Sequence, residues 1–332
     1  MAVPEMMRAI AIRAPGGPEM LVEQRLPVPA PGPGDVLIEV AAAGVNRPDV
    51  LQRQGRYAPP ADASPLPGLE VAGRIVAVGP GVDATAIGSR VCALTPGGGY
   101  AEYVVTAHAQ CLPVPPDFPL EQAAAMPETL LTVWHNLFER AYIVTGDTVL
   151  VHGGTSGIGT MAISLCRLFG IATIVTCGSE AKCRAALDWG ASHAVNYRAE
   201  DFVAAVERIT GGAGVAAVLD MVGGDYLPRN LACLAEDGRH VSIAVLGGVK
   251  AELFIPQIMA RRLTLTGSTL RPRSAAFKAL LVEEIRRTIW SSVATGELRP
   301  AMDRIFPLAE AAAAHAHMEA GDHVGKIVLQ VR

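Results

Sequence analysis

Residues 148–179 read TVLVHGGTSGIGTMAISLCRLFGIATIVTCGS, and this stretch decides the fold. A short apolar run at 149–151, typical of a strand buried on both faces, leads into a glycine-rich turn at 153–159. Apolar residues then recur at helical spacing, and β-branched residues at 172–176 predict a second strand. Strand, glycine turn, helix and strand in this order predict the first βαβ unit of a dinucleotide-binding site.

The glycine-rich turn has two possible roles. Glycines let the backbone approach a pyrophosphate, and the helix that follows offers unpaired N–H groups and the positive end of its dipole. The alternative is a plain tight turn, which needs only one or two glycines. The βαβ context favours dinucleotide binding, and the residues expected to contact the cofactor are Gly154, Ser156, Gly157 and Ile158.

Composition limits the class of protein. The 332 residues suggest about two domains, and with half of them hydrophobic and 18% charged the chain can bury sizeable cores. A net charge of −4 argues against a nucleic-acid partner. No run approaches the ~18 apolar residues of a membrane span, and the start of the chain lacks the apolar segment of a signal peptide. With six scattered cysteines, these features predict a cytoplasmic protein without a membrane partner.

The chain changes character along its length. Residues 7–105 contain short strand-like runs separated by Gly and Pro, which predicts a barrel-like β-rich domain. Residues 147–266 alternate between strand and helix patterns, which predicts a parallel, doubly wound sheet. We expect helices at 120–142, 275–294 and 308–320, and a closing strand at 326–331 that packs back onto the β-rich domain. The predicted class is α/β.

Further segments carry a resemblance to a known family. They are GVNRPD at 44–49, RQGRY at 53–57, PGLEVAG at 67–73, PGGGYAEY at 96–103 and GKIVL at 325–329. With the glycine turn, they cover nearly the whole chain and resemble the zinc-free NADPH:quinone oxidoreductases of the medium-chain dehydrogenase/reductase superfamily, of the tumour-suppressor-inducible and zeta-crystallin-like types. The resemblance implies a GroES-like catalytic domain at 1–124 and 268–332, a Rossmann NADPH-binding domain at 125–267, and a cleft between them.

Zinc is where the sequence departs from the alcohol-dehydrogenase branch of this superfamily. In that branch a Cys stands near position 46 and a His follows Gly68, whereas this chain has Asn46 and Leu69. Neither residue supplies a thiolate or imidazole ligand. His315 and Glu319 could share a helix face, but a solvated helix surface is the more common environment for such a pair. The prediction is that there is no metal site.

The choice of cofactor depends on the end of the second strand. An NAD enzyme places Asp or Glu about 20 residues after the glycine turn. This chain has Gly178, Ser179 and Lys182 there, and Tyr197 ends the next strand. By resemblance the Ser, Lys and Tyr hold the 2′-phosphate of NADPH, whose oxygens favour such donors. Alternatively, Ser179 only caps its helix and Lys182 is solvated, and Glu180 could serve an NAD ribose. We expect NADPH.

The remaining site residues are expected from the resemblance and from the ends of sheet strands. Asn46 and Tyr57 would line the cleft beside the nicotinamide, with Tyr57 as the proton donor, although water could serve and Tyr57 could be a packing aromatic. Asp49 is expected to fix its own loop. The other expected cofactor contacts are Thr132, Ala244, Leu246, Leu270, Arg271 and Lys326.

The sequence is compatible with three functions. The first is an NADPH:quinone oxidoreductase, the second a reductase of activated carbon–carbon double bonds, and the third an NADPH-binding protein with little turnover. The apolar run at 263–266 would leave an unpaired edge of the Rossmann sheet, and pairing with a symmetry mate predicts a homodimer.

Overall fold

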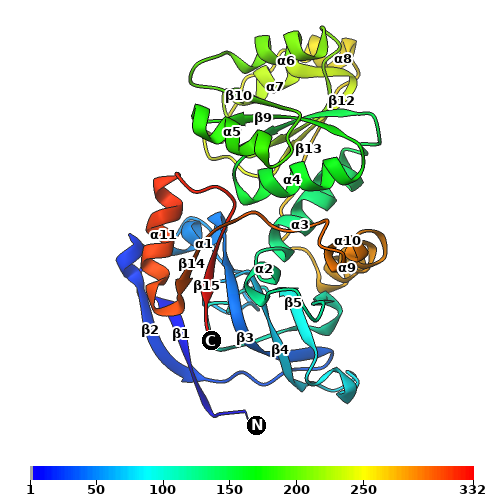
Figure 1. Ribbon diagram of the computed structural model, residues 1–332. Helices are drawn as coiled ribbons and strands as arrows, with labels where there is room; N and C mark the ends of the chain where they lie inside the picture. The colour runs from blue at the N-terminus through cyan, green and yellow to red at the C-terminus, as the bar shows by residue number, and fades with distance from the viewer. Residues whose placement is uncertain (1–2) are drawn as a thin grey trace. The chain divides into compact units, whose positions relative to one another are not determined.

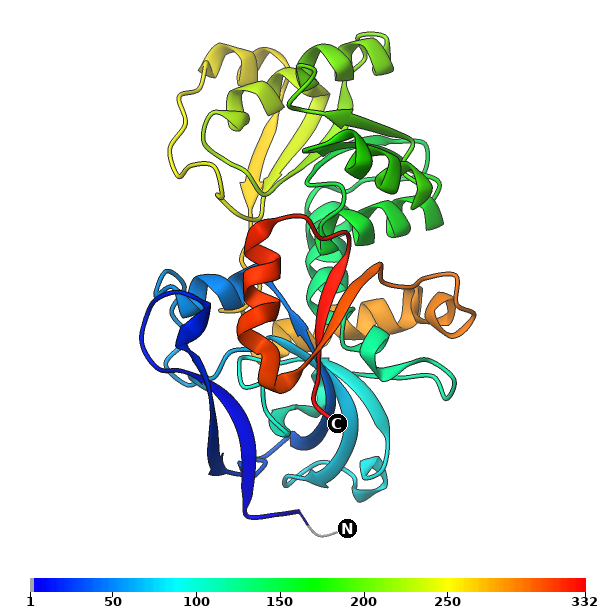
Figure 2. The ribbon, with the colours of Figure 1, turned by 60° about the vertical axis from the view of Figure 1, so that its left-hand side comes forward.

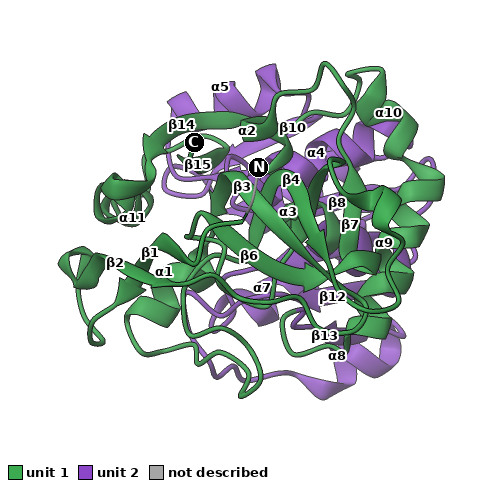
Figure 3. Ribbon diagram, turned by 90° about the horizontal axis from the view of Figure 1, so that it is seen from below, with its two compact units in different colours: residues 1–131, 271–332 green, residues 132–270 purple. Residues whose placement is uncertain are grey.

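The computed structural model describes residues 3–332, which form two compact units (Figure 3). Unit 2 is Thr132–Leu270, and unit 1 comprises the chain on both sides of it, up to Leu131 and from Arg271. The sequence predicted domain boundaries after residues 124 and 267. The compact units change after Leu131 and after Leu270, and helix α2 (Leu120–Ala123) packs against the sheet of unit 1.

Unit 1 is built around a seven-stranded sheet in the order β14-β15-β3-β4-β5-β7, with β6 paired to β3 (Figure 1). Alternating side chains of strand β3, such as Val36, Ile38 and Val40, are fully buried in the hydrophobic core of unit 1. A separate hairpin pairs β1 with β2. The bounds are β1 Met6–Ile12, β2 Leu21–Pro27, β3 Asp35–Val45, β4 Glu70–Val78, β5 Arg90–Leu94, β6 Tyr103–Ala107, β7 Cys111–Pro113, β14 Met302–Pro307 and β15 Lys326–Gln330.

The tail of the chain completes this sheet, as expected. Strand β15 pairs antiparallel with β3, and helix α11 (Ala311–Ala320) packs beside β14 and β15 (Figure 2). Strand β14 was not predicted, because Asp303 and Arg304 interrupt its apolar pattern and most of its side chains are exposed. The expected return of the tail onto the β-rich domain is confirmed.

Two predicted helices of this region were too long. Residues 120–142 form α2, then α3 (Pro127–Val133), then a wider π-helix at Trp134–Arg140. Pro127 has no N–H to continue α2, so a new helix starts there. Residues 275–294 form α9 (Ala275–Thr288) and α10 (Trp290–Ala294), divided at Ile289. The short helix α1 (Arg47–Arg53) was not predicted. Single 3₁₀ turns lie at Pro18–Met20, Ala84–Ala86, His108–Gln110 and Leu308–Glu310.

Unit 2 is a six-stranded parallel sheet in the order β10-β9-β8-β11-β12-β13, with helices on both faces (Figures 1 and 2). The order reverses between β8 and β11, which is where doubly wound sheets bind ligands. The strands are β8 Thr148–His152, β9 Ala172–Cys177, β10 His193–Asn196, β11 Val215–Asp220, β12 Leu234–Ser242 and β13 Thr264–Gly267. The helices are α4 Gly157–Leu168, α5 Glu180–Asp188, α6 Phe202–Thr210, α7 Tyr226–Cys233 and α8 Ile255–Ala260. The predicted doubly wound α/β class is confirmed.

Membrane insertion has no candidate element in the described chain. Between residues 3 and 332, no helix combines the length and the apolar composition that a bilayer span requires.

Candidate functional site

The turn between β8 and α4 requires glycine at several positions. Gly153 has a φ of +71°, a conformation that other residues rarely adopt. A Cβ on Gly154 would lie 2.5 Å from Cγ2 of Val175, and one on Gly159 would lie 2.3 Å from the carbonyl oxygen of Gly153. A plain tight turn would not need all three glycines. The close packing therefore favours the interpretation of this turn as a phosphate-binding loop.

The start of α4 is accessible and capped. Ser156 is the N-cap residue, and its Oγ accepts the N–H of Gly159 at 3.0 Å. Ser156, Gly157 and Ile158 are partly exposed, whereas Gly154 is buried and donates its N–H to the carbonyl of Thr176. The N–H groups of a first helical turn have no partner within the helix and attract anions. Three of the four predicted contacts thus lie at an anion-attracting helix end, and Gly154 shapes the turn.

The residues predicted to bind the 2′-phosphate lie around the end of β9 in unit 2. Ser179 caps α5, with its Oγ accepting the N–H of Lys182 at 3.3 Å. A Cβ on Gly178 would lie 2.9 Å from the hydroxyl of Tyr197, so this hydroxyl stands over Gly178. Tyr197 is 42% exposed, and Ser179 and Lys182 are half-buried. The helix-cap role of Ser179 is observed, and it leaves the phosphate-binding role as a compatible prediction.

Glu180 was the residue that could have favoured NAD. Its carboxylate accepts a hydrogen bond from Nδ2 of Asn196 at 2.8 Å. This bond holds the carboxylate at the end of β10. A carboxylate that already has a partner is a weaker candidate for binding ribose hydroxyls.

The other predicted contacts of unit 2 lie on its crossing segments and after β12. Nδ2 of Asn136 donates to the carbonyl of Thr132, and Oγ of Ser268 donates to Oδ1 of Asn136, both at 2.8 Å. These bonds tie the two ends of the unit together. Leu246 is 53% exposed, and its N–H is bonded to the carbonyl of Met221 at the end of β11. Ala244 is half-buried and Leu270 is buried.

A buried polar cluster organises unit 1. The ammonium of Lys326 donates to Oδ1 of Asn46 at 2.5 Å, to Oε1 of Glu70 at 2.7 Å and to the carbonyl of Val45 at 3.2 Å. Nδ2 of Asn46 donates to the same Glu70 oxygen at 2.8 Å. Asn46, Glu70 and Lys326 are 6%, 0% and 3% exposed. An ammonium has three N–H groups, so Lys326 is fully committed to protein partners, and its predicted contact with the cofactor remains a prediction.

Asp49 fixes its own loop, as expected. One carboxylate oxygen accepts the N–H of Asn46 at 2.8 Å, and the other accepts the N–H of Gly68 at 2.9 Å. Asp49 therefore joins the start of α1 to the segment before β4. Burial raises the pKa of Asp49 to about 6, against the lowering effect of these two N–H groups and of Lys326.

Glu128 is a candidate that sequence reasoning missed. Its N–H donates to Oε2 of Glu70 at 2.8 Å, which places the start of α3 beside the Lys326 cluster. Burial, and then the negative charge of Glu70, raise the pKa of the Glu128 carboxyl to about 7. In the sequence it is an ordinary acidic residue in a first helical turn. Only the fold brings the second carboxylate near it.

Tyr57 pairs with Arg271 within unit 1. Cζ of Arg271 lies 5.4 Å from the centre of the Tyr57 ring, and Tyr57 is half-buried. Burial, and then the charge of Glu128, raise the pKa of the Tyr57 phenol above its ordinary value. The phenol is therefore protonated at neutral pH and can donate a hydrogen bond. Its predicted role as a proton donor remains a prediction.

The expectation that His315 lies on a solvated helix surface was wrong. His315 is fully buried, with Nε2 3.0 Å from the hydroxyl of Tyr100 and Nδ1 3.4 Å from Nη1 of Arg53. Burial, and then the charge of Arg53, lower the pKa of His315 to about 3, so the ring is neutral. Arg53 also pairs with Glu319 at 2.8 Å. The face of α11 that carries His315 packs into the core, which an alanine-rich pattern does not reveal.

Comparison with known proteins adds to this geometry. Residues 157–287 match the family described as zinc-binding dehydrogenase, and residues 32–116 match the alcohol dehydrogenase GroES-like domain. A 2-haloacrylate reductase of a Burkholderia species is 32% identical over 98% of this chain and 99% of its own length. A quinone oxidoreductase of Rattus norvegicus is 31% identical over 98% of each protein. A solved mycobacterial protein complexed with NADPH has a TM-score of 0.86, with 31% identity over 98% of this chain and 100% of that one.

Some relatives are far longer than this chain. A mycocerosic acid synthase-like polyketide synthase of Mycobacterium tuberculosis is 33% identical over 97% of this chain, which spans 15% of the synthase. The chain therefore resembles a whole reductase in some proteins and a small part of a larger synthase in others.

Proposed function

The chain belongs to the medium-chain dehydrogenase/reductase superfamily, and from this premise we propose that it is an NADPH-dependent reductase that transfers hydride to quinones without zinc. In general terms, the chain is an NADPH-dependent oxidoreductase of this superfamily. The quinone acceptor is supported by the similarity to a quinone oxidoreductase. The observation that carries the zinc-free reaction is the buried cluster of Asn46, Glu70 and Lys326.

The residues present do not fit the zinc ion that the matched family's description implies. The donors in the cluster are an amide oxygen, a carboxylate and a backbone carbonyl, and the ammonium of Lys326 is already their cation. Catalytic zinc sites are instead built from thiolates, imidazoles and carboxylates at the metal. In the described part of the chain, residues 3–332, there is also no group of three or more His, Cys, Asp or Glu side chains suited to a metal ion. The proposed reaction therefore has no step through zinc.

The residues of unit 2 do fit NADPH. The glycine turn and the start of α4 would hold the pyrophosphate, and Ser179, Lys182 and Tyr197 would hold the 2′-phosphate. The nicotinamide supplies the hydride when it is bound. The protein's part is to orient the acceptor and keep water away.

Proton supply is the protein's second task, because a reduced quinone must gain protons on its oxygens. Tyr57 holds its proton at neutral pH and is partly exposed, so it is the proposed donor to the acceptor. Glu128 has a pKa of about 7 and acts on Tyr57 through its charge. Protonated Glu128 carries no charge and therefore does not oppose negative charge on the Tyr57 oxygen as that phenol gives up its proton. We propose that Glu128 acts in this way through Tyr57, as a positioning residue.

Reduction of an activated carbon–carbon double bond is the second candidate. The similarity to a 2-haloacrylate reductase over 99% of that protein's length favours it. The same hydride would add to the electron-poor carbon, and the same proton donor would serve its neighbour.

The acceptor can be identified by following NADPH oxidation with p-benzoquinone, phenanthrenequinone, an unsaturated aldehyde and a haloacrylate. We expect the quinones to give the highest kcat/KM. A clear preference for the aldehyde or the haloacrylate would select the second candidate. Tight NADPH binding without turnover of any acceptor would contradict both and support a sensor or structural role.

We also propose a homodimer formed through the sheet of unit 2. Strand β13 is an edge strand, and the helix before it carries exposed apolar side chains: Phe254, Ile255 and Met259 are 70%, 56% and 73% exposed. Unpaired edges and exposed apolar patches both favour association. Light scattering at micromolar concentration should give twice the chain mass, and Met259→Glu should weaken association. A persistent monomer would contradict the proposal.

A further inference from the structure

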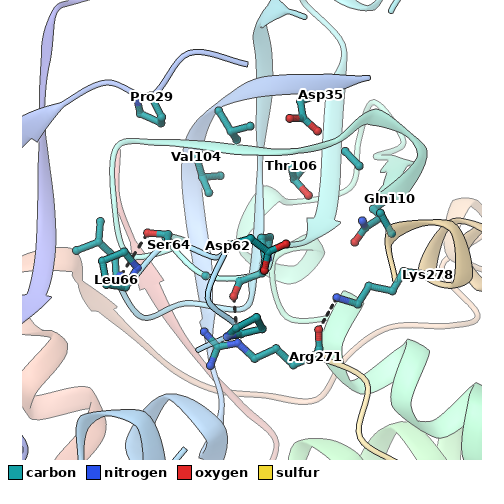
Figure 4. Close-up of a pocket in the computed structure, with 18 of the residues that line it drawn as sticks. Pro29, Asp35, Asp62, Ser64, Leu66, Val104, Thr106, Gln110, Arg271 and Lys278 are labelled. Atoms are coloured by element: carbon teal, nitrogen blue, oxygen red, sulfur yellow. Dashed lines mark hydrogen bonds between the residues drawn. The ribbon is translucent and has the colours of Figure 1, made fainter. Parts of the chain in front are cut away.

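Unit 1 contains a cavity of about 740 Å³ whose lining includes Arg271 among the residues expected at the reaction site, but not Tyr57, Asn46, Glu128 or Lys326 (Figure 4). Its walls come from the β1–β2 hairpin, the loops at 60–66 and 96–98, strand β6, and the segment 271–278. All of these belong to unit 1. The volume is in the range of small-molecule sites in proteins, roughly 300–1,000 Å³.

Much of the wall is apolar. Leu26 is among the lining residues, and Pro29, Leu66 and Val104 line the cavity as Figure 4 shows. A ligand with an apolar body would remove these surfaces from water, which is the usual source of affinity in such sites.

One corner of the cavity contains cationic side chains, and one of their N–H donors has no hydrogen-bond acceptor in the described chain. Arg271 is 7% exposed; its Nε donates to the carbonyl of Pro96 and its Nη1 to Oε1 of Gln52. Its Nη2 is buried without a hydrogen-bond partner anywhere in residues 3–332. Buried donors nearly always have partners, and an unpaired one destabilises the folded protein. This nitrogen lies beside Gly97, which lines the cavity, so a ligand acceptor that reaches it past this loop would complete its hydrogen bonding.

Lys278 strengthens the same corner. It is 5% exposed, and its Nζ donates to the carbonyl of Arg271 at 2.8 Å, as Figure 4 shows. An ammonium has three N–H groups, so it can also bond an anion. Burial lowers the pKa of Lys278 against the raising effect of the Glu128 charge, and the like charge of Arg271 adds to the lowering. Ser274 and Ala275, at the start of the 14-residue helix α9, line the corner too and add the positive end of a helix dipole.

The charge of the lining selects the kind of anion. Three cationic side chains, Arg271, Arg273 and Lys278, face two anionic ones, Asp35 and Asp62, which leaves one net positive charge. A single negative charge would neutralise this lining, whereas a phosphate dianion would leave one negative charge uncompensated.

We propose that this cavity binds an amphipathic monocarboxylate, with the carboxylate on Nη2 of Arg271 and the ammonium of Lys278 and the apolar body against Leu26, Leu66 and Val104. The site goes beyond the proposed reaction, although its Arg271 also contacts the Tyr57 ring and is an expected cofactor contact. Octanoate binding is measured without NADPH and without turnover, so its failure and the failure of the proposed reaction are distinguishable.

The first test uses the unaltered full-length protein. Calorimetry would compare octanoate with octanol, which has the same chain without the charge. We expect octanoate to bind at least about 10-fold more tightly, because hydrogen bonds to a charged group are stronger than neutral ones. Equal affinities, or no octanoate binding at millimolar concentration, would overturn the proposal.

The second test uses matched variants. Arg271→Gln should reduce the affinity for octanoate to that for octanol. The affinity for octanol itself should change by less than about threefold, whereas a general loss of structure would reduce it too. Arg273→Gln removes the same charge from an exposed neighbour and should weaken octanoate by less than about threefold. If Arg271→Gln bound octanoate as the unaltered protein does, or if Arg273→Gln had the larger effect, the proposed site would be wrong.

Discussion

The glycine turn of unit 2 and the Lys326 cluster of unit 1 contrast in how their parts are brought together. The turn is local, because its glycines, its helix cap and its strand lie within a dozen residues. The cluster is assembled from Asn46, Glu70 and Lys326, which are up to 280 positions apart, and each is nearly or fully buried. Removing one part of a local turn affects ligand binding, whereas removing one partner of a buried charged cluster affects the whole fold.

The largest effect is expected for Lys326→Met. The change leaves the fully buried carboxylate of Glu70 without its cation, which costs about 3–5 kcal/mol in comparable buried pairs. Urea unfolding should show this loss, and adding Glu70→Gln should recover part of it. Lys250→Met, at an exposed lysine, should change the free energy of unfolding by less than about 0.5 kcal/mol. A loss in Lys326→Met no larger than in this control would show that the cluster does not hold unit 1 together.

A smaller effect is expected for Glu128→Gln, and it depends on pH. The folded-state pKa of about 7 lies above the ordinary 4.5, so the folded state holds the proton longer than the unfolded state. Stability from this group is therefore greatest below pH 4.5 and falls as the pH rises through 7. The variant should lack a decline of roughly 3 kcal/mol. The pKa of Asp49 is raised from 3.8 to about 6, so both proteins should still lose stability as the pH rises from about 3.8 to 6.

Urea unfolding at several pH values, with Glu121→Gln as the control, measures this difference. Parallel pH profiles for the unaltered protein and Glu128→Gln would mean that the Glu128 carboxyl is not raised by its surroundings.

The smallest effect is expected for Lys182→Ala, in the local region. Loss of one charge-assisted bond from a half-buried lysine should cost about 1–2 kcal/mol of NADPH binding. This corresponds to roughly a 5- to 30-fold rise in the Kd for NADPH. NADH lacks the 2′-phosphate and should bind unchanged. Arg184→Ala, at an exposed position of the same helix, is the control, and titrations at two salt concentrations should show a smaller difference at the higher one. Equal losses for NADPH and NADH would mean that this loop does not bind the phosphate.

The same contrast explains what the sequence could predict. Local spacing predicted both domain types, the strands around the glycine turn and the cap at Ser179, because each depends on neighbouring residues. It did not predict the partners of Lys326, the raised pKa of Glu128 or the burial of His315. Those depend on contacts between distant segments. The cavity at Arg271 has the same origin, because no single segment contains both its apolar wall and its cationic corner.

We propose that hydride transfer from NADPH proceeds here without a metal, with the ammonium of Lys326 in the place of a metal cation among Asn46, Glu70 and the Val45 carbonyl. The most direct measurement is the rate of NADPH oxidation by a quinone before and after exhaustive chelation, with metal content checked in the same samples. We predict the same kcat/KM in both, and no increase when zinc is added. Loss of the activity on chelation and its return with zinc would contradict the account.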